Sequence, residues 1–246
     1  MSRVAVEESD LMGFPHHRCR QPEVMDQPDL HPERHRHALS GLARLNRLSL
    51  TARTCHRPLH DLQTALNRDR LRILDVACGG GDVAVALWER AARAGLDWRI
   101  AGCDVSPLAV ETARTNARRA AADVHFFVHD VLARPVPTAY DAVICSLFLH
   151  HLEERQAVEL FRSLAELGTR LILVNDLDRS RTGFLLAYLA SRLFTRSPVV
   201  HTDALRSVRA AFRPAEAVAL AERGGLYGAT IRRCWPCRWL LAWRRS

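Results

Sequence analysis

Residues 71–82 read Leu-Arg-Ile-Leu-Asp-Val-Ala-Cys-Gly-Gly-Gly-Asp, and they restrict the possible folds of this chain more than any other stretch. A mainly aliphatic run ends at Asp75 and passes into three glycines, and an amphipathic helical pattern begins at about Val83. A strand, a glycine turn and a helix in this order form the first unit of a nucleotide-binding parallel sheet. Gly79 and Gly81 can adopt backbone angles closed to other residues, and without side chains they let a ligand lie against the main chain.

The spacing of the glycines distinguishes this turn from a dinucleotide-binding one. A dinucleotide turn has the pattern G-x-G-x-x-G, whereas this chain has Asp-x-Ala-x-Gly-x-Gly beginning at Asp75. The next hydrophobic strand, 98–103, ends at Asp104, whose carboxylate can accept hydrogen bonds from ribose hydroxyls. Asp104 can also belong to the start of the helix that Ser106 would cap, and the two roles are compatible.

Two further predicted strands are also followed by polar residues. Strand 124–128 leads to Asp130, and strand 140–145 leads to Ser146 and then to a His-His-Leu sequence. The four predicted strands, each followed by polar residues, resemble those of the class I S-adenosylmethionine-dependent methyltransferases in their order and separation. The resemblance covers roughly residues 70–175.

The resemblance implies a cofactor, S-adenosylmethionine, and the residues that bind it. In that family the first turn receives the amino-acid part of the cofactor, and the acid after the second strand binds the ribose. The acid after the third strand accepts a hydrogen bond from the adenine amine, and the next backbone amide meets the ring. Carried onto this sequence, the cofactor-binding residues are Asp75, Ala77, Gly79, Gly81, Asp104, Val105, Asp130, Val131, Cys145 and Ser146.

Strands and helices alternate along the central part of the chain. Such alternation predicts a parallel sheet with helices on both faces. With the resemblance, it gives an α/β fold with a doubly wound, Rossmann-like, seven-stranded and mostly parallel sheet. The expected helices are 82–94, 107–121 and 153–167, the expected fifth strand is 170–174, and the closing antiparallel pair is 229–233 and 238–244.

Three further segments complete the expected organisation. Residues 1–25 are polar, contain two prolines and lack periodicity, so we expect a mobile segment. A recurrence of leucines predicts a helical cap over residues 26–67, broken near Pro58. The methyltransferase domain would then span residues 68–246, and the resemblance places a helical, substrate-binding insertion at about 177–212, after the fifth strand.

Three polar residues are candidates for catalysis. His150 and His151 follow the fourth predicted strand, and Asp176 follows the fifth. In a doubly wound sheet these strand ends converge on one crevice. Methyl transfer to oxygen needs a base for the hydroxyl proton, a task that suits a histidine oriented by a carboxylate. The alternative is that one histidine packs against a helix and the other is solvated.

Charge and composition give expectations about partners and location. The formal net charge is +8, and all 35 basic residues are arginine, spread along the chain. This pattern favours a composition bias of the source genome over a nucleic-acid surface. The absence of a long apolar run and of an apolar leader predicts a cytoplasmic chain without stable membrane insertion. We expect no metal site, and a structural role for the pair Cys234 and Cys237.

The methyl acceptor is constrained mainly by the resemblance. Methyltransferases that act on nucleobase amines have Asp/Asn-Pro-Pro-aromatic after the fourth strand, whereas residues 145–148 here read Cys-Ser-Leu-Phe. The chain resembles the ubiquinone/menaquinone-type and secondary-metabolite branch of the family. That branch implies a small, aromatic acceptor of phenolic, quinone-type or polyketide character, methylated at oxygen in preference to carbon.

Other functions remain open from the sequence. One is methyl transfer to carbon on a similar acceptor, and another is a catalytically silent scaffold that binds S-adenosylmethionine. Whatever its function, the chain could form a homodimer. A nicotinamide-dependent oxidoreductase is disfavoured because no G-x-G-x-x-G follows the first strand.

Overall fold

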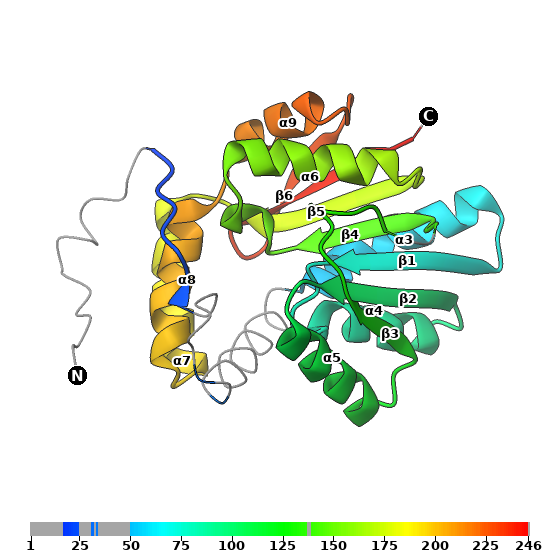
Figure 1. Cartoon of the computed structure of the whole chain (residues 1–246), viewed down its shortest axis with the longest axis horizontal. Coiled ribbons are helices and arrows are strands. Elements are labelled where there is room, and N and C mark those ends of the chain that lie inside the picture. The colour runs from blue at the N-terminus through cyan, green and yellow to red at the C-terminus, as the bar shows by residue number, and fades with distance from the viewer. Residues whose placement is uncertain (1–16, 25–30, 32, 34–49, 137–138, 246) are drawn as a thin grey trace.

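The computed structural model describes residues 17–24, 31, 33, 50–136 and 139–245. It contains one seven-stranded sheet in the order β3-β2-β1-β4-β5-β7-β6, in which β7 alone runs antiparallel to both of its neighbours (Figure 1). The predicted doubly wound, mostly parallel sheet is therefore confirmed. The strands are β1 (Arg70–Val76), β2 (Asp97–Asp104), β3 (Val124–Val128), β4 (Ala142–Ser146), β5 (Leu171–Leu177), β6 (Thr230–Cys234) and β7 (Arg238–Arg244).

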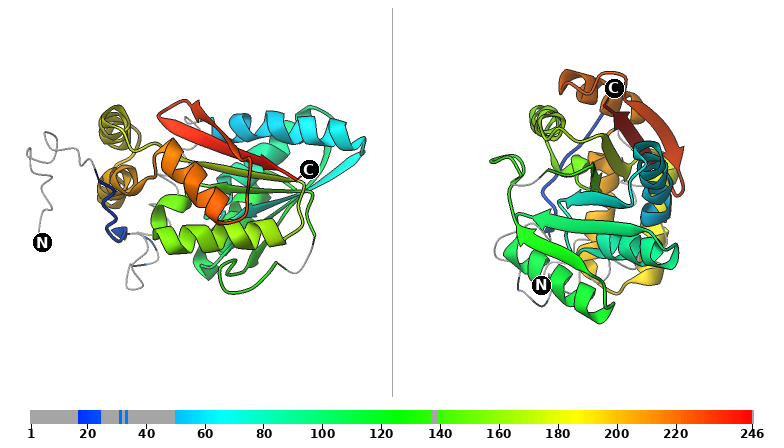
Figure 2. Two further views of the ribbon diagram at one scale, coloured as in Figure 1. Left: turned by 90° about the horizontal axis from the view of Figure 1, so that it is seen from above. Right: turned by 90° about the vertical axis from the view of Figure 1, so that its right-hand side faces the viewer.

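Helices cover both faces of the sheet. Viewed along the sheet, α3 lies on one side and α6 on the other (Figure 2). The helices are α3 (Thr51–Leu66), α4 (Asp82–Arg93), α5 (Pro107–Arg119), α6 (Glu154–Glu166), α7 (Arg181–Phe194), α8 (Pro198–Ala210) and α9 (Pro214–Arg223), with a short 3-10 helix η2 (Leu149–His151) after β4. No helix in the described part of the chain is long and apolar enough to cross a membrane.

Alternation along the buried strands produces two hydrophobic cores. In β1, Leu71 and Ile73 pack with α3, α4 and α5, whereas Leu74 and Val76 point to the opposite face. That opposite core is completed by side chains of α6 and α9, including the fully buried Phe161. Because a central parallel strand is buried on both faces, it reads in the sequence as a nearly continuous apolar run.

The register aligns the carboxyl ends of the parallel strands. Val76 of β1 pairs with Cys103 of β2 on one side and with Cys145 of β4 on the other. Ser146 pairs in turn with Asn175 of β5. The strand order reverses between β1 and β4, and in sheets of this kind ligands bind outside the carboxyl ends at that reversal.

Helix α3 differs from its prediction because it continues through Pro58. Proline has no N–H, so the carbonyl of Thr54 loses its helical partner. Arg232 of β6 supplies a replacement, since its Nη2 lies 3.3 Å from that carbonyl oxygen. The tertiary contact therefore compensates for the missing hydrogen bond. Most of the rest of the predicted cap, 26–49, lies outside the described residues.

Residues 17–24 of the N-terminal segment lie against α8 (Figure 1). The Cys19 N–H donates to the carbonyl of Arg209 at 3.1 Å, and the Val24 N–H donates to Asp203 Oδ1 at 2.8 Å. These are long-range contacts, which local composition does not reveal. Residues 1–16 and 25 lie outside the described part.

The segment after β5 forms two helices beyond the carboxyl edge of the sheet (Figure 1). Helix α8 begins at Pro198, because Ser197 caps it and proline suits its first turn. At the other end of the chain, Cys234 and Cys237 flank the β6–β7 turn as free thiols. This position agrees with the turn expected there.

Gly81 gives a direct test of the packing around the glycine turn. A Cβ at Gly81 would lie 2.6 Å from Phe126 Cζ and 2.9 Å from Ala113 Cβ, at a φ of +73°. We expect Gly81→Ala to lower the free energy of unfolding by about 2–4 kcal/mol, combining overpacking with left-handed strain. Gly95→Ala is the matched control, because Gly95 has a φ of +69° with no atom within 4 Å of its Cβ position. Equal losses in urea denaturation would contradict this packing.

Candidate active site

The glycine turn presents open main chain at the end of β1. Gly79 has a φ of +52°, and a Cβ built there meets no atom within 4 Å. Its N–H donates to Asp104 Oδ2 at 2.9 Å, which ties the turn to the end of β2. The structure thus brings the glycine turn and Asp104 together, with space beside the backbone where a ligand can lie.

Asp104 is half-buried at the end of β2, and its two oxygens hold two backbone segments. Oδ1 accepts from the Ser106 N–H at 2.9 Å, and Ser106 Oγ caps α5 by accepting from Ala109 at 3.3 Å. Ser106 is therefore the cap, and each carboxylate oxygen of Asp104 keeps capacity for a further hydrogen bond. The neighbouring Val105 is 64% exposed, an apolar surface suited to contact a flat ring.

Asp75 is a buried acid with an unsatisfied oxygen. Its Oδ1 has no hydrogen-bond partner in the described part of the chain. Burial, with the nearby charges of Asp82 and Asp104, raises the pKa of Asp75 well above its usual range. A cationic amino group at the turn would satisfy this oxygen. Two residues further on, Ala77 adopts a φ of +53°.

The remaining predicted cofactor residues lie along the same edge. One oxygen of Asp130, after β3, accepts from the N–H groups of Leu132 and Ala133. The side chains of Val131 and Cys145 are buried in the core, which leaves only their backbones to meet a ligand. Ser146 Oγ, at the end of β4, is buried without a hydrogen-bond partner among the described residues.

Together these residues fit S-adenosylmethionine. The end of β1 has a buried acid with an unsatisfied oxygen, and the open glycine turn follows it. The end of β2 has an acid beside an exposed apolar side chain, and a further acid follows β3. These match the cationic amino group, the ribose and the adenine that the sequence predicts at this edge.

A second group of polar side chains lies on the other side of the reversal, beyond β4 and β5. His150 is buried in η2, and its Nδ1 lies 2.7 Å from Asp176 Oδ1. The His150 backbone N–H donates to the other oxygen, Oδ2, at 3.1 Å. Asp176 is part of β5, two positions beyond the end of the expected strand. The predicted pairing of a histidine with Asp176 is present, and the histidine is His150.

Glu23 joins this pair from the N-terminal segment. Its Oε1 lies 3.5 Å from His150 Nε2 and its Oε2 lies 3.9 Å from His151 Nε2. Ser207 of α8 hydrogen-bonds to Oε1. Glu23 is 7% exposed, so the two histidines share a buried carboxylate.

The two carboxylates determine the charge of His150. Burial alone would lower its pKa, but Asp176 and Glu23 outweigh that effect and raise the pKa to about 10. Burial likewise opposes ionisation of Glu23, yet the contacts with the histidines and Ser207 lower its pKa to about 2. We therefore interpret His150 as a cation held between two carboxylates at neutral pH, which leaves His151 as the candidate base.

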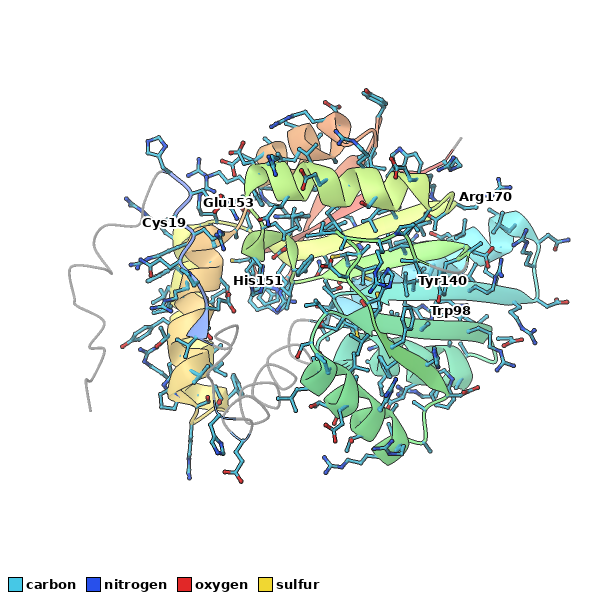
Figure 3. All side chains as sticks on the ribbon, in the orientation of Figure 1. Cys19, Trp98, Tyr140, His151, Glu153 and Arg170 are labelled. Carbon is cyan, nitrogen blue, oxygen red and sulfur yellow. The ribbon has the colours of Figure 1, made fainter. Side chains whose placement is uncertain are left out.

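His151 is the histidine that faces the edge of the sheet. Figure 3 shows it between the strand ends and the layer of α7 and α8. Its ring lies 4.4 Å from that of His150 and stacks at 6.2 Å on Phe148. Its side chain is 22% exposed against 4% for His150, so solvent or a ligand can reach it.

Glu23, His150 and His151 also have the residue types of a two-histidine, one-carboxylate metal site, and their ligand atoms lie within 4.8 Å of one another. We interpret them as an ion cluster because both ring nitrogens of His150 already face carboxylates. Each of those contacts holds a proton on the ring, and a proton on Nε2 occupies the lone pair that a metal would need.

Sequence reasoning missed Glu23. It is a single acid beside Pro22 in a stretch without periodicity, and it lies more than 120 residues from the histidines. The pairing depends on α8, which holds both Glu23 and Val24 through Ser207 and Asp203. No local signal in the sequence could have placed it at this edge.

Comparison with known proteins agrees with the fold and with S-adenosylmethionine as the cofactor. Residues 73–168 match a family model described as a methyltransferase domain. The demethylmenaquinone methyltransferase of Thermus thermophilus is 35% identical over 127 residues, which are 50% of this chain and 56% of that protein. The ubiquinone biosynthesis O-methyltransferase of Xanthomonas euvesicatoria pv. vesicatoria is 30% identical over 181 residues, which are 69% of this chain and 72% of that protein.

Solved structures share the fold at low identity. The plantazolicin methyltransferase BpumL, solved in complex with SAH, superposes with a TM-score of 0.65 at 14% identity, covering 90% of this chain and 92% of that one. The magnesium protoporphyrin IX methyltransferase of Synechocystis PCC 6803, also with bound SAH, gives a TM-score of 0.55 at 20% identity, covering 79% of this chain and 83% of that one.

The charged state of His150 predicts a pH dependence of stability. Its pKa rises on folding from a usual value of about 6.5 to about 10, so the stabilisation is complete below about pH 6.5 and is lost as the pH rises through 10. We expect the free energy of unfolding of the wild type to fall over this window relative to that of His150→Gln. The other titrating groups are common to both proteins, so their effects cancel in the difference. Parallel curves in urea denaturation at several pH values would contradict the assignment.

Proposed function

Because this chain belongs to the class I S-adenosylmethionine-dependent methyltransferases, we propose that it methylates a hydroxyl oxygen of a small aromatic acceptor. The observation that carries the proposal is the position of His151, at the carboxyl edge of the sheet and beyond the cofactor turn. Phenolic, quinone-type and polyketide acceptors share the chemistry that such a site requires, a ring that carries an acidic hydroxyl.

The cofactor side of the site is built by β1, β2 and β3. Asp75 receives the amino group, the main chain at Gly79 lies against the amino-acid part, and Asp104 accepts from the ribose hydroxyls. Val105 and Asp130 meet the adenine ring and its amine. The contacts of Asp104 with the glycine turn preorganise both elements, which lowers the ordering cost of binding.

The acceptor side is built by η2, β5 and the N-terminal segment. S-Adenosylmethionine supplies an electrophilic methyl group, and transfer breaks its bond to sulfur, which keeps the electron pair, as the bond to the acceptor oxygen forms. His151 takes the hydroxyl proton and later releases it to water, as a general base does. His150 and Asp176 hold the backbone and the ring beside it, and Phe148 offers an aromatic face to the acceptor.

Two observations support a quinone-type acceptor and methylation at oxygen. The Thermus relative is named a demethylmenaquinone methyltransferase, and the Xanthomonas relative is named a ubiquinone biosynthesis O-methyltransferase. A base beside an aromatic side chain also suits a phenolic hydroxyl. Methylation of a ring carbon is the second candidate, because removal of the same proton activates the ring position next to the oxygen. NMR of the product made with a carbon-13 methyl donor separates a methoxy group from an aryl methyl group.

The test of the proposal is a pair of variants measured against a panel of phenolic and quinol acceptors. We expect His151→Ala to lower kcat by about 10²- to 10⁴-fold, the range for loss of a general base, with S-adenosylhomocysteine affinity unchanged. We expect Asp104→Ala to weaken S-adenosylhomocysteine binding at least about tenfold, equivalent to about 1.4 kcal/mol. Calorimetric titration and initial rates measure the two effects.

The matched controls are His125→Ala and Asp123→Ala, which remove an exposed histidine and an exposed acid near β3. Neither should change turnover or affinity. Full turnover by His151→Ala would exclude it as the base, and unchanged binding by Asp104→Ala would contradict the cofactor assignment. A wild-type chain that binds S-adenosylhomocysteine but methylates no acceptor would favour the scaffold alternative.

A further inference from the structure

We propose that Glu23 is a positioning residue for methyl transfer, and that docking of residues 17–24 onto α8 and η2 completes the acceptor side of the site. Glu23 would compensate the charge of His151 when that ring holds the acceptor's proton. The inference rests on the proposed function, since it concerns the same base. It assigns a role to a segment far from the cofactor turn in the sequence.

The docking is specific and begins with Arg18. Its Nη2 donates to the carbonyls of His150 at 2.9 Å and Leu152 at 2.7 Å, and its Nε donates to Ala210 at 2.5 Å. The guanidinium lies 3.8 Å from the centre of the Phe212 ring. One side chain thereby joins the N-terminal segment to η2, to the end of α8 and to Phe212, two residues beyond that helix.

Further contacts extend along the segment and end at Glu23. Arg20 Nε lies 2.6 Å from Glu153 Oε1, and Arg206 Nη1 donates to the carbonyl of Pro22 at 2.8 Å. Ser207 then holds the Glu23 carboxylate. The segment is therefore held at both ends, by Arg18 and by Glu23. This fixes the position of the Glu23 carboxylate, as a residue that must hold a defined geometry requires.

The charges at the end of this segment alternate. Asp176 from β5 faces His150, His150 faces Glu23, and Glu23 faces His151, with contacts of 2.7, 3.5 and 3.9 Å. A proton on His151 would place a second cation 4.4 Å, ring to ring, from the cationic His150. Glu23 is the anion that lies between them, so it offsets a repulsion that would otherwise oppose uptake of the proton.

Other charged groups near the cluster are already paired or lie on its far side. Asp203 of α8 accepts from the Val24 N–H, and Asp176 is held by His150. Arg238 of β7 interacts electrostatically with Asp176, and donates to Thr51 at 2.8 Å. Among the described residues, Glu23 is the carboxylate that contacts both histidine rings.

The test is Glu23→Gln, which removes the charge and keeps the shape. We expect kcat to fall at least about tenfold, with S-adenosylhomocysteine affinity within about twofold of the wild type. The dependence of kcat on pH should differ between the variant and the wild type, because the anion that contacts both histidine rings is gone. Glu222→Gln, on the exposed face of α9, is the control and should leave all three quantities unchanged.

A double variant decides whether Glu23 acts through His151. If it does, Glu23→Gln combined with His151→Ala should be no slower than His151→Ala alone, because residues that act as one unit are not additive. Multiplicative losses would overturn the proposal, as would full activity of Glu23→Gln. Arg18→Ala, which releases the segment, should repeat the loss of kcat with cofactor affinity intact.

The failures of the two proposals are distinguishable. If the wild type methylates no hydroxylated acceptor, the proposed function fails before Glu23 is tested. If the wild type turns over and His151→Ala does not, while Glu23→Gln is as fast as the wild type at every pH, only the role of Glu23 is lost.

Discussion

The acceptor side of this molecule depends on a single buried ion cluster, in which His150 is a cation between Asp176 and Glu23. The cluster joins three parts of the chain: the end of β5, the 3-10 helix after β4 and the N-terminal segment. Breaking one partner of a buried pair leaves an uncompensated charge, which costs about 3–5 kcal/mol. The cluster therefore sets the shape of this edge and holds the Glu23 carboxylate beside His151.

The strand order explains why the proposed cofactor residues and the proposed acceptor residues occupy separate halves of one edge. The turn after β1 and the acids after β2 and β3 lie on one side of the reversal, and the histidines and Asp176 after β4 and in β5 lie on the other. An in-line transfer needs its two reactants on opposite sides of the reacting carbon, and alignment supplies much of the rate. The topology provides that separation before any side chain is considered.

Local sequence signals determine most of this fold and half of this site. The alternating strands, the glycine turn and the acids at strand ends could all be read from residues 70–175, because each depends on backbone geometry close in sequence. The continuation of α3 through Pro58 could not, since it depends on Arg232. The role of Glu23 could not either, since it depends on a docked segment whose partners lie more than 120 residues away.

The most direct test of the ion cluster is the protonation of the His150 ring, observed by nitrogen-15 NMR of the labelled chain. At about pH 8, between the usual pKa of about 6.5 and the raised pKa of about 10, we expect protons on both ring nitrogens of His150. A neutral His150 ring at that pH, with one nitrogen bare, would contradict the ion cluster. It would also remove the reason for assigning the base to His151.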